Sequence, residues 1–134
     1  MVVNLDTSAA SARAARAAVR DYATDRHLDG RVVEAALVVT SELVSNAVQH
    51  GEAPITLCLQ QLGDGALRVE VCDADDTIDQ VHGVRSGELA TSGRGLAIVT
   101  AYSRDWRVER RADGKSVAAD IAGTDAPPSG VTLQ

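Results

Sequence analysis

Aromatic residues are almost absent from this chain of 134 residues, which contains no phenylalanine, one tryptophan and two tyrosines. A surface that stacks the bases of single-stranded nucleic acid needs several aromatic rings, so such a surface is not expected here. Basic residues are also too few for a duplex-binding surface, because 13 lysines and arginines are outnumbered by 19 acidic residues and the net charge is −6. We therefore expect no direct contact with nucleic acid.

Cysteines, leader sequences and long apolar runs are likewise scarce. The two cysteines, Cys58 and Cys72, lack the spacing of metal ligands and fall within predicted strands, so we expect both to be reduced thiols. No apolar run approaches the roughly 18 to 20 residues that cross a bilayer, and the first residues have no signal-peptide pattern. These absences predict a cytoplasmic protein that makes no membrane contact.

Small aliphatic residues are abundant instead, and 45% of the chain is hydrophobic, enough for one core of ordinary size. We expect residues 1–122 to form a single domain and residues 123–134 to form a disordered tail. Hydrophobic periodicity predicts three helices and five strands. The predicted strands are 2–5, 55–60, 67–73, 106–110 and 116–121, and the predicted helices run from a cap at Asp6, Thr7 or Ser8 to about Arg26, from about Arg31 to Gln49, and from Leu96 to Ser103.

The second and third predicted strands are joined by a Gly-Asp-Gly sequence and should form an antiparallel hairpin. A two-residue turn would mix polar and apolar faces, whereas a turn centred on Asp64 keeps the apolar residues on one side. Cys58 and Cys72 are then only diagonal neighbours, too distant for a disulfide. The pairs that this register predicts are Leu57 with Val71, Leu59 with Val69, and Cys58 with Glu70.

Asp73 ends the third predicted strand on the same side as Val69 and Val71, the side that should face the helices. A buried carboxylate without hydrogen bonds would be costly, so Asp73 needs a partner. Its position alone leaves two interpretations open, a cap of the following loop or a contact with a ligand.

The second predicted helix carries a carboxylate and a carboxamide four residues apart, Glu42 and Asn46. They share one side of the helix, at the margin of its apolar stripe. Magnesium prefers oxygen ligands and keeps several waters, so the Asn46 amide oxygen is a candidate ligand. Glu42 could orient or deprotonate a hydroxyl or water beside a terminal phosphate. Taken alone, both residues could equally be solvated helix positions.

Glycines precede the third predicted helix in the segment Ser92-Gly93-Arg94-Gly95-Leu96. Glycine lets the backbone approach a ligand closely, and the helix that follows presents unpaired N–H groups to a phosphate. The preceding residues, about 74–92, are polar and acidic and have no strong period, which predicts a lid. Earlier in the chain, Arg13, Arg16 and Arg20 line one side of the first helix, as a solvated basic face or a docking stripe for an acidic protein.

Four segments, in the order ELVSNAVQHG, VEVCDAD, SGRGLAIV and DGKSVAADI, resemble the ATP-binding boxes of the GHKL superfamily, which includes gyrase, histidine kinases, MutL and heat-shock chaperones. The likeness is strongest to single-domain anti-sigma factor kinases of the RsbW type and extends from about Val2 to Ile121. It implies an α/β (α+β) two-layer sandwich, with a mixed, mainly antiparallel sheet covered by helices on one face. It also implies ATP and Mg²⁺ as cofactors.

The resemblance implies a role for each box. Glu42 would be the catalytic base, Asn46 the magnesium ligand, and Asp73 the acceptor for the adenine amino group. The segment with Gly93, Arg94, Gly95 and Leu96 would line the phosphates, and Lys115 and Ser116 would lie near the base. After Asp73 this chain lacks both glycines of the family pattern Asp-x-Gly-x-Gly, so the turn beneath the base should differ.

Two functions follow from the resemblance. In the first, the protein is a serine/threonine kinase that phosphorylates an anti-sigma antagonist and restrains a sigma factor by direct contact. In the second, it is a catalytically silent module that sequesters a sigma factor or antagonist with or without nucleotide. The intact Glu42 favours the kinase, and the altered turn after Asp73 favours the silent module. The sequence leaves homodimerisation open.

Overall fold

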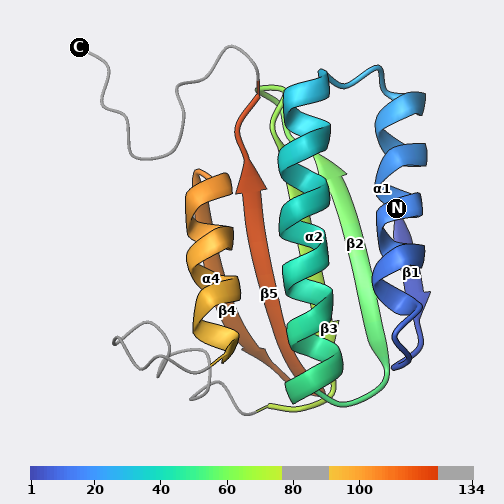
Figure 1. Cartoon of the computed structure of the whole chain (residues 1–134), viewed down its shortest axis with the longest axis vertical. Helices are drawn as coiled ribbons and strands as arrows, with labels where there is room; N and C mark the ends of the chain where they lie inside the picture. Colours follow the sequence, from blue (N-terminus) through green and yellow to red (C-terminus); the bar gives the residue numbers. More distant parts are fainter. Residues whose placement is uncertain (77–90, 124–134) are drawn as a thin grey trace.

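The computed structural model describes residues 1–76 and 91–123, except for the side chains of residues 91–96. One face of a single sheet with strand order β1-β2-β3-β5-β4 is covered by the three described helices (Figure 1). The elements are β1 (Val2–Leu5), α1 (Ser11–Asp25), α2 (Gly30–His50), β2 (Ile55–Gln61), β3 (Leu67–Asp73), α4 (Thr91–Tyr102), β4 (Asp105–Arg111) and β5 (Gly114–Ile121).

The predicted two-layer sandwich is confirmed. Each of the four described strand pairs is antiparallel, so the expected parallel component of a mixed sheet is not found among the described residues. Residues 77–90, which make up most of the predicted lid, and residues 124–134 of the predicted tail lie outside the description.

The register predicted for the β2–β3 hairpin is confirmed. Leu57 lies opposite Val71, Leu59 opposite Val69, and Cys58 opposite Glu70. Both cysteines are free. Burial and the neighbouring Glu70 raise the pKa of the Cys72 thiol to about 11, so this thiol stays protonated and unreactive at neutral pH.

The core lies between the sheet and the helices and is built from aliphatic side chains together with the buried ring of Tyr22. Valine, leucine, isoleucine and alanine fill it because the chain offers so few aromatic rings. Small side chains also let α1 and α4 pack closely beside α2. Its fully or nearly fully buried members include Ala15, Val19, Ala36, Val39, Leu43, Val44, Ile55, Leu57, Leu67, Val69, Val71, Val99, Ala119 and Ile121.

Helix α1 begins later than predicted. Its N-cap is Ala10, which makes no side-chain cap, so the predicted cap at Asp6, Thr7 or Ser8 is wrong. Ser8 instead forms a turn ahead of the helix, in which its Oγ donates to Asp6 Oδ1 at 2.7 Å and accepts from the Ala10 N–H at 3.2 Å. The polar residues therefore satisfy each other before the helix begins.

Helix α2 is the central helix of its layer (Figure 1). The side chain of Asp29 caps it by accepting from the Arg31 N–H at 2.8 Å. By length and hydropathy α2 could cross a membrane, which corrects the expectation that no segment of the chain reaches that length. Its apolar side packs against α1, α4 and the sheet, as the core helix of a sandwich does.

Thr40 is the polar exception in this buried stripe. It is completely buried, and its Oγ1 has no hydrogen-bond partner among the described residues. Thr40→Val keeps the shape and removes the unpaired hydroxyl, so we expect a gain of about 1 kcal/mol in the free energy of unfolding. Thermal denaturation should then show a Tm raised by roughly 3 °C.

The matched control is Thr24→Val, which makes the same change at an exposed position of α1. Its Tm should stay within about 1 °C of wild type, because surface substitutions rarely change stability much. A lower Tm for Thr40→Val than for wild type would show that the hydroxyl makes a bond that stabilises the fold.

Candidate functional site

Glu42 and Asn46 lie on one flank of α2, half-buried, as predicted. Helix α1 runs along the opposite flank, since Arg16 of α1 donates to Ser41 Oγ at 3.3 Å. At about 100° per residue, Glu42 and Asn46 point away from α1 and toward the side on which α4 lies (Figure 1). The two side chains therefore lie on the flank of α2 that is turned away from α1.

Four chain segments meet at one end of the sandwich. The C-terminal end of α2, the N-terminal end of α4, the end of β3 and the start of β5 all lie at this end in Figure 1. Helix α2 contacts α4, β3 and β5, and β3 pairs with β5. The fold thus brings together the four segments that hold the predicted site residues.

The glycine segment is helical rather than a turn before a helix. Helix α4 begins at Thr91, so Gly93 and Gly95 lie within its first two turns, which corrects the predicted start at Leu96. The first four N–H groups of a helix have no acceptor within it, and here they include those of Gly93 and Arg94. The segment still offers backbone donors to an anion, whereas the side chains of Arg94 and Leu96 lie outside the description.

Asp73 has protein partners on one of its two oxygens. Its side chain is 4% exposed, and its Oδ1 accepts from the Asp75 N–H at 2.8 Å and from Lys115 Nζ at 3.1 Å. Its Oδ2 accepts no hydrogen bond within residues 1–76 and 91–123. Asp73 therefore caps the loop, as one interpretation predicted, and still keeps one oxygen for a ligand.

Lys115 completes a buried ion pair with Asp73. The two residues lie opposite each other in the β3–β5 ladder, and the Lys115 side chain is 7% exposed. Its ammonium also donates to the Asp75 carbonyl at 3.2 Å. The family resemblance placed Lys115 near the base, but it did not predict this pair, because no local pattern shows that β3 and β5 are neighbours.

Ser116 lies on the other face of the sheet. Side chains alternate along a strand, so Ser116 points away from the helices and shares the open face with Cys72 and Glu109, its partners on the neighbouring strands. It is buried, but its side chain does not join Asp73 and Lys115. Only its backbone adjoins the candidate site.

Two glycines enclose Asp73. A Cβ at Gly51 would lie 2.5 Å from Asp73 Cγ, and a Cβ at Gly114 would lie 1.8 Å from the Asp73 carbonyl oxygen. Gly51 is the C-cap of α2, but its φ of −98° is available to any residue. Its role is instead steric, because it lets the end of α2 approach the carboxylate closely.

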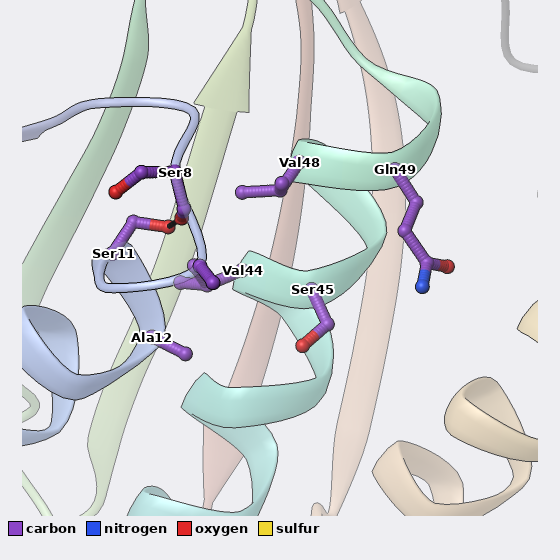
Figure 2. A pocket seen from close by; sticks show the side chains of 8 residues that line it. Ser8, Ser11, Ala12, Val44, Ser45, Val48 and Gln49 are labelled. Carbon is purple, nitrogen blue, oxygen red and sulfur yellow. Dashed lines mark hydrogen bonds between the residues drawn. The ribbon is translucent and has the colours of Figure 1, made fainter.

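A separate hollow lies on the α1 side of α2 (Figure 2). It has a volume of about 270 Å³, and Figure 2 shows Val44 and Val48 turned toward Ser8 and Ser11 across it. None of the candidate residues on α2, α4, β3 or β5 lines it. It is therefore separate from the candidate residues.

A family model for the histidine kinase-like ATPase domain matches residues 5–121. The chain belongs to this family. The expected GHKL-like identity is thereby confirmed, and membership of an ATPase domain family implies ATP binding. An uncharacterized protein of Streptomyces coelicolor is 34% identical over 85 residues, which cover 62% of this chain and 81% of that protein.

Solved structures share the fold of this ATPase domain. The structure of the RsbU and RsbW domains of Rv1364c from Mycobacterium tuberculosis matches 98% of this chain with a TM-score of 0.70 and 25% identity. This chain covers 34% of that larger protein. The SiaB–SiaC complex of Pseudomonas aeruginosa contains a chain that matches 90% of this one and is covered to 89%, with a TM-score of 0.63 and 18% identity.

Proposed function

We propose that this ATPase domain binds magnesium ATP where α2, α4, β3 and β5 meet. We further propose that it transfers the terminal phosphoryl group to a serine or threonine of an anti-sigma antagonist and restrains a sigma factor by direct contact. The observation that carries the proposal is that the C-terminal half of α2, which holds Glu42 and Asn46, lies toward the same end of the fold as the end of β3 at Asp73 and the start of α4 (Figure 1). Such a protein would act in the cytoplasm.

The site offers one oxygen ligand from the protein, which is sufficient for a magnesium ion that binds together with the nucleotide. No cluster of three His, Cys, Asp or Glu side chains that could hold a metal exists among the described residues. Magnesium keeps several waters and accepts phosphate oxygens as ligands, so a single protein oxygen is enough. The Asn46 amide oxygen fits that part, and ATP with its ion would supply the phosphoryl group and neutralise its charge.

Glu42 is suited to the proton transfer. It lies one turn before Asn46 on the same flank, so it would face a hydroxyl that approaches the terminal phosphate. The hydroxyl oxygen forms the new bond to phosphorus, the bond to the bridging oxygen of ADP breaks, and Glu42 accepts the hydroxyl proton. The N–H groups at the start of α4 would stabilise the phosphate charge.

The basic side of α1 suits an acidic partner protein. Arg13 and Arg20 are exposed, and neither forms an ion pair within the described residues. In a chain of net charge −6, a line of unpaired arginines gives a local surface of opposite sign that can steer an acidic partner. The similar chain in the SiaB–SiaC structure is itself part of a complex of two proteins.

A catalytically silent, partner-binding module is the second candidate. It is favoured by the ion pair with Lys115, which occupies one oxygen of the carboxylate that would recognise the base. The test is incubation with Mg²⁺, [γ-³²P]ATP and each candidate antagonist protein encoded in the same genome. A labelled antagonist supports the kinase, whereas tight antagonist binding without label would establish the silent module.

A further inference from the structure

The Asp73 carboxylate is held in one orientation by groups on three sides. Its Oδ1 accepts from the Asp75 N–H and from Lys115 Nζ, and its Oδ2 lies where a side chain at Gly51 would come within 2.6 Å. The loop behind it is tied down by a hydrogen bond of 2.8 Å from the Ala74 N–H to the Glu52 carbonyl. Rotation of the carboxylate would break two hydrogen bonds at once.

Lys115 neutralises the charge of this buried carboxylate through an ion pair. Both side chains are less than a tenth exposed, and an unpaired charge in such a place would be strongly disfavoured. Arg110, which lies opposite Lys115 on β4, is exposed and donates to the Asp76 carbonyl at 3.3 Å rather than to Asp73. Within the described chain, Lys115 alone pairs with Asp73.

We propose that Lys115 is a positioning residue that sets the base specificity of the nucleotide site through Asp73. Together with the Asp75 N–H, Lys115 engages Oδ1 and holds the carboxylate so that Oδ2 is the oxygen left to accept from a single exocyclic amino group. This inference rests on the proposed binding of ATP at this site. It assigns to Lys115 a function beyond the neutralisation of a buried charge.

The selectivity follows from the number of acceptors. The amino group of a 6-aminopurine needs one acceptor, which Oδ2 supplies. Guanine presents two neighbouring N–H donors that are best met by both oxygens of a carboxylate, and Oδ1 is already occupied. When a purine without the amino group binds, Oδ2 is buried without a hydrogen-bond donor. The cost of this unpaired oxygen weakens the binding of that purine.

The experiment is calorimetric titration with Mg²⁺ and three probes, ATP, GTP and purine riboside triphosphate, which lacks the amino group. Wild type should bind ATP roughly 10- to 100-fold more tightly than either other nucleotide, the value of one hydrogen bond to a charged acceptor. In Lys115→Met the affinity for ATP should exceed the affinity for purine riboside triphosphate by only about threefold or less. In Lys115→Arg the wild-type ratio of these affinities should largely persist. If Lys115 had only a structural role, its substitution would weaken the binding of all three nucleotides by a similar factor and leave the ratio unchanged.

Arg110→Met is the matched control, because it removes a cation from the facing position without touching Asp73. It should keep the wild-type ratio. If circular dichroism shows that the methionine variant is unfolded, Lys115→Gln is measured instead. Because glutamine keeps a donor for Oδ1, this variant should keep the wild-type ratio, and loss of the ratio in the folded glutamine variant would overturn the inference.

Two outcomes separate the inference from the function on which it rests. If wild type discriminates, Asp73→Asn loses the discrimination and folded Lys115→Met keeps it, the inference is overturned while nucleotide binding stands. If wild type binds none of the three nucleotides, the proposed function fails and the inference fails with it.

Discussion

Gly114→Ala is expected to prevent stable folding. A Cβ at this position would lie 1.8 Å from the Asp73 carbonyl oxygen and 2.7 Å from the Ala74 Cα, both atoms of the backbone. The φ of +151° is also one that L side chains rarely adopt. Backbone strain and overpacking should together cost about 4 kcal/mol or more, a large part of the roughly 5 to 15 kcal/mol by which domains are stable.

Urea denaturation followed by circular dichroism measures this loss. Gly63→Ala is the matched control, because a Cβ there would meet no atom within 4 Å. Its midpoint should stay close to wild type, whereas Gly114→Ala should be unfolded or have a midpoint lowered by more than half. A Gly114→Ala protein of wild-type stability would mean that β3 and β5 do not approach each other in this way.

Glu42→Gln is expected to stop phosphoryl transfer while leaving nucleotide binding intact. Glutamine keeps the size and the hydrogen-bonding oxygen but cannot accept the hydroxyl proton. Removal of a general base typically costs about 10²- to 10⁴-fold in turnover. The Kd for ATP should stay within about threefold of wild type, because Glu42 acts on the attacking hydroxyl and not on the nucleotide.

The measurement is the initial rate of ³²P transfer to the antagonist, with the Kd determined separately by calorimetry. Glu34→Gln serves as the control, since this glutamate lies on the same helix at an exposed position. It should transfer phosphate at the wild-type rate. If Glu42→Gln also retains the wild-type rate, another group must accept the proton.

Local patterns predicted those parts of the fold that depend on neighbouring residues. The alternation of apolar side chains was enough to set the β2–β3 register, because a shift by one residue would have exposed Leu57 and Leu59. The helical period likewise placed Glu42 and Asn46 at the margin of the core. In both cases one face of the element is buried, and this determines the register of the hairpin and the orientation of the helix.

Contacts between distant segments could not be predicted in the same way. Nothing local shows that β5 lies beside β3, so the pairing of Asp73 with Lys115 emerged only from the structure. The steric role of Gly51 depends on the same close approach. These long-range contacts build the part of the candidate site that would recognise the base.

The start of α4 was misplaced for a different reason. Glycine costs about 1 kcal/mol relative to alanine within a helix, so Gly93 and Gly95 indicated a turn. The later turns of α4 pack against α2, and Val99 is fully buried there. Tertiary packing of this kind routinely overrides weak local preferences, and the helix begins at Thr91.

Calorimetric titration with a nonhydrolysable ATP analogue tests most directly whether α2 and α4 hold one nucleotide between them. Wild type should bind the analogue with a Kd that rises at least about tenfold when EDTA removes Mg²⁺, and Asn46→Ala should bind weakly with or without the ion. Ser45→Ala, which alters the neighbouring residue on the α1 side, should behave as wild type. If Asn46→Ala binds as tightly as wild type in Mg²⁺, or wild type shows no binding, the proposed site is contradicted.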